Sequence, residues 1–138
     1  MKMKTTFDGQ LCVNSSHSAQ ALLKDNMCGL DHEEVWILLL TARCTVIAKE
    51  MVAMGTLCHA SIDCRTVLRR ALLNNAMGII LLHNHPSGDP RPSPQDIRFT
   101  SKLRDACRLF DIKLLDHIIV AGEHFYSFAE EQTHKTIQ

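Results

Sequence analysis

Apolar residues form short unbroken runs at several places along the chain, and these runs predict buried strands. Residues 34–40 read EVWILLL and residues 79–82 read IILL, as expected of strands that are covered on both faces. Residues 44–53 follow the first run after a short connection and are predicted to be its hairpin partner. Two further strands are expected toward the C-terminal end, at 112–120 and 125–128.

Other segments carry apolar residues at helical spacing. Residues 19–27 predict a first helix, and Asp63 precedes a second one that extends to the glycine before the run IILL. Ser93 and Asp96 have the spacing of a capping box and begin a third helix that continues over 97–109. The expected order is α-β-β-α-β-α-β-β, which predicts an α/β fold of the α+β type with helices on both faces of a mixed β-sheet.

Composition and charge narrow the class of protein. The chain has 138 residues, which favours one domain, and its 15 Lys and Arg side chains balance its 15 Asp and Glu. Proteins that bind the phosphate backbone of nucleic acids usually carry an excess of basic residues, so this balance argues against nucleic acid as the main partner. None of the six cysteines forms a CxxC pair and the first ten residues are polar, so reduced thiols in a cytoplasmic protein are expected. The longest apolar runs fall far short of the ~20 residues that span a bilayer, so no membrane partner is expected.

The strand at 79–82 leads directly into a candidate metal site. His83 and His85 flank one residue, and on extended backbone their side chains point the same way, so both can reach one cation at about 2.0–2.1 Å. Asp96, at the start of a helix, can turn its carboxylate back toward the end of the strand. Two imidazoles and one carboxylate leave a fourth position for water, which is typical of catalytic zinc. The alternative is a polar turn before a capped helix, which needs no metal, and spacing alone leaves both interpretations open.

Residues 83–96, HNHPSGDPRPSPQD, resemble a known family. The pattern H-x-H-P followed by P-S-x-x-D resembles the JAMM motif of the JAB1/MPN metallopeptidase family, and the whole string resembles its RadC-type bacterial branch. The resemblance extends over 33–131 through further RadC-like strings, which are GTL at 55–57, Arg65, LLDHIIV at 114–120 and YSFAEE at 126–131. It implies a JAB1/MPN-like fold with a cytidine-deaminase-like layout.

The resemblance also implies roles for single residues. His83, His85 and Asp96 would bind Zn²⁺, and Ser93 would hydrogen-bond the oxyanion or the water that the metal holds. The implied activity is that of a zinc metallohydrolase, a metallopeptidase or isopeptidase that cleaves an amide bond in a peptide or protein substrate. The sequence identifies neither the physiological substrate nor the oligomeric state.

A general base comes, in this family, from a glutamate at the start of an earlier strand. The string HEEVWILLL offers Glu33 and Glu34 at that place. Successive side chains of a strand point to opposite faces, so only one of the two can serve. The RadC-like pattern favours Glu33.

Other residues have both a chemical and a plain structural interpretation. Asp116 and His117 also resemble RadC sequence, and they either orient the metal ligands or form a buried polar pair. Arg65 is expected to form a salt bridge at a helix start, and Trp36 to lie in the core. No special role is expected for two cysteines, Cys58 and Cys64.

Departures from the RadC pattern leave the proposed ligands untouched and concern substrate contacts instead. Thr41 stands where RadC-type sequences usually have Asp, Cys64 where Pro often occurs, and Asp111 where Gly is common. Residues 1–30 are expected to form a helical extension packed on a JAB1/MPN domain at 31–138, with no room for the helix-hairpin-helix region of many longer members. A DNA-binding role that depends on that region therefore does not transfer.

Three functions remain in competition at this point. The first is a zinc-dependent hydrolase, which rests on the complete set of His83, His85, Ser93 and Asp96. The second is a RadC-type accessory protein of DNA repair or recombination that associates with DNA. The third is a binding module that keeps the fold without activity.

Overall fold

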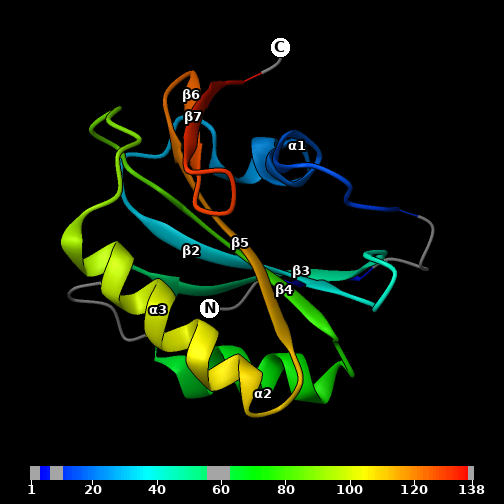
Figure 1. Ribbon diagram of the computed structural model, residues 1–138. Helices are drawn as coiled ribbons and strands as arrows, with labels where there is room; N and C mark the ends of the chain where they lie inside the picture. Colours follow the sequence, from blue (N-terminus) through cyan, green and yellow to red (C-terminus); the bar gives the residue numbers. More distant parts are fainter. Residues whose placement is uncertain (1–3, 7–10, 56–62, 137–138) are drawn as a thin grey trace.

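The computed structural model describes residues 4–6, 11–55 and 63–136, and within them one mixed sheet runs through the molecule (Figure 1). Its strand order is β1-β3-β2-β4-β5-β6-β7. Within this sheet β4 and β5 are parallel, and every other neighbouring pair is antiparallel. The strands are β1 (Lys4–Thr6), β2 (Glu34–Leu40), β3 (Val46–Met54), β4 (Gly78–Asn84), β5 (Lys113–Ala121), β6 (His124–Ser127) and β7 (Gln132–Lys135).

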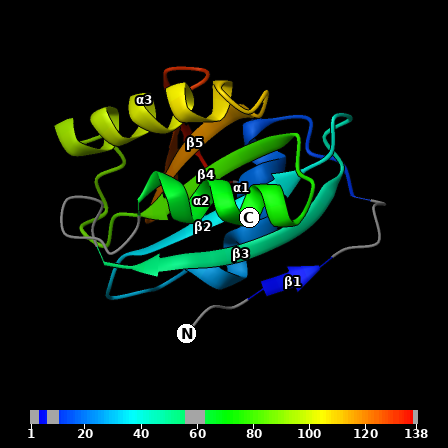
Figure 2. The same cartoon turned by 90° about the horizontal axis from the view of Figure 1, so that it is seen from below.

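Helices of the described chain cover both faces of the sheet, as predicted. The first, α1 (Ser16–Met27), lies on one face, and α2 (Cys64–Leu73) and α3 (Pro94–Arg108) lie side by side on the other (Figure 2). Each of these helices begins with a side-chain cap, because Ser15, Asp63 and Ser93 each accept a hydrogen bond from a backbone N–H of the first turn. Within the described residues no helix is both long and apolar enough to cross a membrane.

Strand β2 separates two hydrophobic cores. All seven of its residues are buried, and its side chains alternate between the two faces. Ile37 and its neighbours two positions away pack with α2 and α3, whereas Trp36 packs with Leu23 and other residues of α1. The prediction that Trp36 lies in the core and that 34–40 is covered on both faces is confirmed.

The structure corrects the predicted elements in three places. Two edge strands, β1 and β7, were not expected, so the strand predicted at 125–128 is not the final one. Both edges are short and polar (KTT and QTHK) and offer no apolar alternation. The second helix also ends earlier than its pattern suggested. It stops at Leu73, and Asn75 has a φ of 53°, a left-handed conformation that asparagine tolerates better than most residues. Residues 56–62, which include Cys58 and most of the RadC-like string GTL, lie outside the described residues.

The departures from the RadC pattern have local explanations. Thr41 bonds its hydroxyl to that of Thr45 at 2.5 Å and closes the turn between β2 and β3. Asp111 has a φ of 55°, a conformation in which glycine carries no steric penalty, so the usual glycine suits this position. Cys64 opens α2 and is buried. None of these three residues takes part in the bonds of the candidate site described below.

The crossover between the two parallel strands sets the position of that site. Because β4 and β5 run parallel, their C-terminal ends meet at the same edge, with His83 beside Ile119. Helix α3 connects these strands and must begin where β4 ends, so its first turn faces the same edge. The last residues of β4 and the first turn of α3 are therefore brought together by topology.

Candidate metal centre

Two histidines at the end of β4 turn their rings toward one point. His83 is 1% exposed and faces the α3 side of the sheet, like Leu81 two residues before it. His85 follows the strand, and its backbone N–H donates to the carbonyl of Val120 at 2.8 Å, which prolongs the pairing with β5. The two Nε2 atoms lie 3.0 Å apart.

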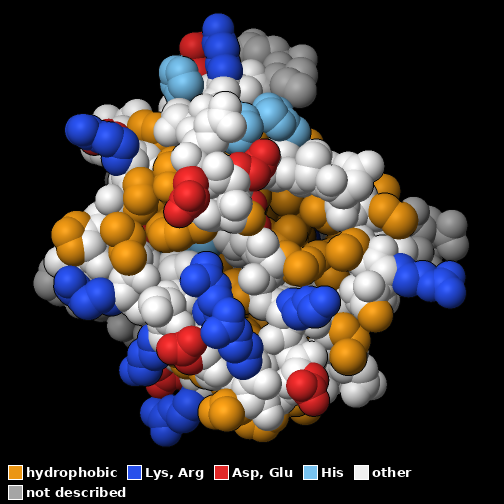
Figure 3. Space-filling model, viewed as in Figure 1, with side chains coloured by type: hydrophobic (Ala, Val, Ile, Leu, Met, Phe, Trp, Pro, Cys, Tyr) orange, Lys and Arg blue, Asp and Glu red, His pale blue; other side chains and the backbone are white. Residues whose placement is uncertain are grey.

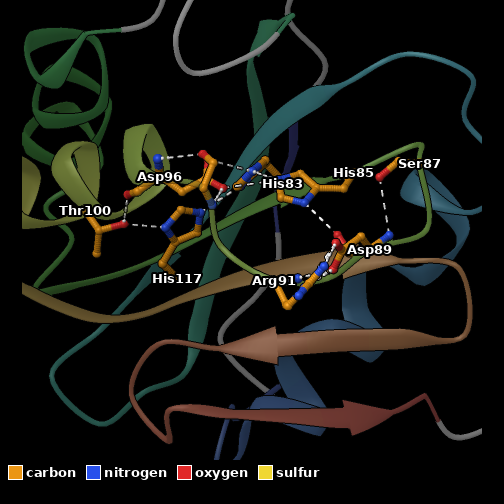
Figure 4. A network of polar contacts seen from close by, with 9 residues as sticks. His83, His85, Ser87, Asp89, Arg91, Asp96, Thr100 and His117 are labelled. Carbon is orange, nitrogen blue, oxygen red and sulfur yellow. Dashed lines mark hydrogen bonds and ion pairs between the residues drawn. The ribbon is translucent and has the colours of Figure 1, made fainter.

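Asp96 completes the cluster from the first turn of α3 (Figure 4). Its Oδ1 lies 3.2 Å from His83 Nε2 and its Oδ2 3.2 Å from His85 Nε2. Four-coordinate zinc with ligands at about 2.0–2.1 Å holds neighbouring ligand atoms about 3.3 Å apart. The spacing of these donors and their N,N,O chemistry therefore fit one zinc ion.

The capping box and the metal-ligand set use the same residues without conflict. Ser93 N–H donates to Asp96 Oδ2 at 2.8 Å, and Asp96 N–H donates to Ser93 Oγ at 3.0 Å. Burial opposes ionisation of Asp96, but the adjacent His83 and His85 rings and the Ser93 N–H outweigh it and hold the pKa of this carboxyl well below its usual range. The carboxylate is thus kept as an anion, which is the form that binds a cation.

A hydrogen bond and a salt bridge stabilise the loop between the ligands. His85 Nδ1 lies 2.8 Å from the carbonyl oxygen of Asp89. A carbonyl can only accept, so Nδ1 carries the proton and the lone pair of neutral His85 is on Nε2, which faces the cluster. Arg91 in turn binds the Asp89 carboxylate at 2.8 Å, and this hydrogen bond lowers the pKa of Asp89 to about 2. The four prolines of the loop restrict it further.

The two candidate glutamates point to opposite sides, as predicted. A carboxylate oxygen of Glu33 lies within 4.8 Å of a ring nitrogen of both His83 and His85. Glu34 is 9% exposed and accepts from Trp36 Nε1 at 3.0 Å, with His32 Nε2 2.7 Å from its other oxygen. The structure brings Glu33 to the cluster and leaves Glu34 in a separate hydrogen-bonding set.

The two RadC-like residues of β5 have different surroundings. His117 is fully buried, and its Nε2 lies 2.7 Å from His83 Nδ1, so it contacts a candidate ligand directly. Asp116 points away and accepts from Ser127 Oγ at 2.6 Å and from the Ala129 N–H at 2.9 Å. Of the two interpretations, orientation of a ligand suits His117, and a buried structural role suits Asp116.

The remaining predictions have plain structural outcomes. Arg65 forms the expected salt bridge, with its guanidinium 3.1 Å from Asp63 at the start of α2. Burial raises the pKa of the Cys64 thiol, so this cysteine stays protonated and unreactive near neutral pH, as expected. The prediction for Cys58 falls outside the described residues.

Sequence reasoning missed two residues that support the cluster. Asn84 is buried, accepts from the Glu34 N–H at 2.7 Å and donates to the His32 carbonyl at 2.8 Å. It thereby ties the end of β4 to the backbone next to Glu33. Thr100 is also buried and lies one helical turn after Asp96. A polar residue on a buried strand face and one at i+4 from a ligand were the signals that could have identified them.

Comparison with known proteins shows which family this chain resembles. Residues 13–133 match the family model described as RadC-like JAB domain. The chain is 43% identical over 120 residues to the UPF0758 protein YfjY of Escherichia coli (strain K12), covering 87% of this chain and 75% of that one. It is 41% identical over 122 residues to a UPF0758 protein of Desulforudis audaxviator (strain MP104C), covering 88% of this chain and 53% of the relative. A UPF0758 protein of Flavobacterium johnsoniae is 38% identical over 119 residues, covering 86% of this chain and 52% of the relative.

Several of these relatives are longer than the chain, which matches about half of their length. Residues 13–133, which the family model matches, nevertheless contain the strand-end histidines and the first turn of α3. The chain therefore belongs to the RadC-like JAB domain family.

Proposed function

We propose that the protein is a zinc-dependent hydrolase of the JAMM type that cleaves an amide or isopeptide bond in a peptide or protein substrate. The observation that carries this proposal is the convergence of His83, His85 and Asp96, whose donor atoms lie 3.0–3.2 Å apart. Three protein ligands leave a fourth position for water or substrate, which distinguishes catalytic from structural zinc. Glu33 lies beside this set, where its carboxylate can serve as the general base that the reaction needs.

Each residue then has a defined task in hydrolysis. Zinc bound at this site would lower the pKa of its coordinated water toward ~7 and polarise the scissile carbonyl. Glu33 accepts a proton from the attacking water and returns it to the leaving amine nitrogen as the C–N bond breaks. Ser93 uses only an oxygen lone pair in capping α3, and among the described residues no acceptor takes its hydroxyl proton. That proton is available to hydrogen-bond the oxygen that becomes negatively charged.

A substrate screen tests this function. Zinc-loaded protein is incubated with peptides, isopeptide-linked conjugates and nucleic acids, and Glu33→Gln and His85→Ala are run in parallel. We expect cleavage of an amide or isopeptide bond by the wild type and loss of cleavage in both variants. If every activity found survives Glu33→Gln, the protein is a binding module rather than this hydrolase.

Association with nucleic acid is a second candidate because basic side chains are concentrated on two helices. Figure 3 shows Lys and Arg side chains gathered over the lower part of the face where α3 lies in Figure 1. Among the exposed residues of α2 and α3, Asp105 is the one acid, against six bases: Arg65, Arg69, Arg98, Lys102, Arg104 and Arg108. Such a face favours a polyanion even though the net charge of the chain is zero.

Salt-dependent binding tests this second candidate. Duplex DNA is titrated with the wild type, with Arg98→Glu/Lys102→Glu, and with Arg43→Glu as a control on the turn between β2 and β3. Binding that weakens with salt and is lost only in the double variant supports the candidate. Absence of binding at low salt, or equal binding by all three proteins, removes it.

A further inference from the structure

A continuous chain of hydrogen bonds links two of the candidate ligands through residues that do not touch the metal position (Figure 4). Thr100 Oγ1 donates to the backbone carbonyl of Asp96 at 2.7 Å. The same oxygen lies 2.5 Å from His117 Nδ1, and His117 Nε2 lies 2.7 Å from His83 Nδ1. The chain thus runs from the backbone of one ligand, through α3 and β5, to the ring of another.

The direction of each bond follows from the number of protons available. A backbone carbonyl can only accept, so the single hydroxyl proton of Thr100 is committed to Asp96. The Thr100 oxygen must then accept from His117 Nδ1–H. A neutral imidazole carries one N–H, so His117 Nε2 is left with a lone pair and accepts from His83 Nδ1–H. His83 therefore directs the lone pair of its Nε2 toward the position between His85 and Asp96 at which a metal ion would be held.

The surroundings of His117 hold its ring in the orientation that these hydrogen bonds require. The ring is fully buried and stacks on Phe128, with centroids 4.5 Å apart and planes 3° from parallel. A buried ring without water contact favours the uncharged form, because desolvation penalises charge. Rotation of the ring by half a turn would break both of its hydrogen bonds. Stacking and hydrogen bonding therefore select one orientation.

We propose that Thr100 and His117 are positioning residues that fix the tautomer of His83, so that His83 binds its metal through Nε2. The purpose of this arrangement rests on the proposed metal centre, but the tautomers exist in the metal-free protein. His85 reaches the same state more simply, through the Asp89 carbonyl in the loop. His83 is buried within the sheet, so the acceptor for its Nδ1–H must come from another side chain.

Imidazole ¹⁵N NMR tests the assignment directly, without metal or substrate. In chelator-treated wild type at a pH where the rings are neutral, we expect His83 and His117 both to carry their proton on Nδ1. A His83 ring with its proton on Nε2 overturns the proposal. Because this readout needs no zinc, it stands or falls separately from the hydrolase function.

Zinc affinity tests the consequence of the arrangement. Thr100→Val removes the hydroxyl with little change of shape, and we expect its zinc Kd to rise about 10- to 100-fold, as for other residues that orient ligands. Thr100→Ser restores the hydroxyl and should recover most of the affinity. Ser127→Ala removes another buried hydroxyl, one that takes no part in these hydrogen bonds, and should leave the zinc Kd unchanged.

Three outcomes distinguish the possible failures. A Thr100→Val protein that binds zinc as tightly as wild type contradicts the proposal. If Thr100→Val does not fold, the ¹⁵N spectrum of the wild type still decides the tautomer. A wild type that binds no zinc but shows both Nδ1–H tautomers keeps the hydrogen-bond assignment and removes the proposed hydrolase.

Discussion

Two adjacent glutamates at the start of β2 have opposite surroundings, and this difference makes a sharp test. Glu33→Gln removes the proposed base, so we expect kcat to fall about 100- to 10,000-fold while zinc remains bound. Glu34→Gln changes a carboxylate that bonds Trp36 and His32, so kcat should stay close to wild type. Steady-state kinetics and zinc content of the two variants make the comparison. The reverse pattern would assign the base to Glu34.

Ser93 is expected to serve both stability and catalysis, and α1 provides a matched control. Ser93→Ala removes the cap of α3 and should cost about 1 kcal/mol of unfolding free energy. It also removes the proposed oxyanion donor, so kcat should fall about 100- to 1,000-fold. Ser15→Ala removes the equivalent cap of α1 and should cost similar stability without loss of kcat. Equal effects of both substitutions on kcat would mean that Ser93 acts only as a helix cap and has no role in catalysis.

At the scale of elements, α1 is predicted to be part of the domain's stability because it covers one face of the sheet. Leu23→Ala should cost about 2–5 kcal/mol of unfolding free energy, since this side chain is 1% exposed among the core residues of that face. Leu22, next to it, is only partly buried and serves as the control. Denaturant unfolding measures both. A cost for Leu23→Ala as small as that for Leu22→Ala would mean that α1 contributes little.

Elements were predictable from the sequence where their signal is local. The run EVWILLL and the Ser93 capping box are complete within a few residues, and both occur in the structure as predicted. Strand β7 could not be predicted in this way, because QTHK is held by its pairing with β6 rather than by its own pattern. The early end of α2 is accompanied by the left-handed backbone conformation of Asn75, which the spacing of apolar residues does not indicate.

The site shows the same division between local and distant information. His83 and His85 are neighbours in sequence, so spacing alone made them candidates. Choosing Glu33 required the family resemblance, because fifty residues separate it from His83 and only the register of β2 with β4 brings them together. His117 and Thr100 meet across β5 and α3, and the direction of their hydrogen bonds depends on three-dimensional contacts.

At the scale of the whole molecule, the low pKa of Asp96 makes the stability of the metal-free protein depend on pH in acid. Its folded pKa lies well below the ordinary value of 3.8. The unfolded chain therefore takes up a proton below that pH that the folded protein does not, so the stabilisation present above pH 3.8 is lost as the pH falls. Thermal unfolding in chelator should show a shallower loss of stability toward pH 2.5 for Asp96→Asn than for wild type. Parallel curves for the two proteins would contradict this.

The zinc content of the purified protein tests the metal centre most directly. Wild type and Asp96→Ala are purified without chelator or added zinc, and metal is measured against protein concentration by elemental analysis. Because His83, His85 and Asp96 have the spacing of one ligand set, we predict close to one zinc per chain in the wild type and its loss in the variant. A zinc-free wild type, or an Asp96→Ala protein that retains its zinc, would contradict the proposed centre.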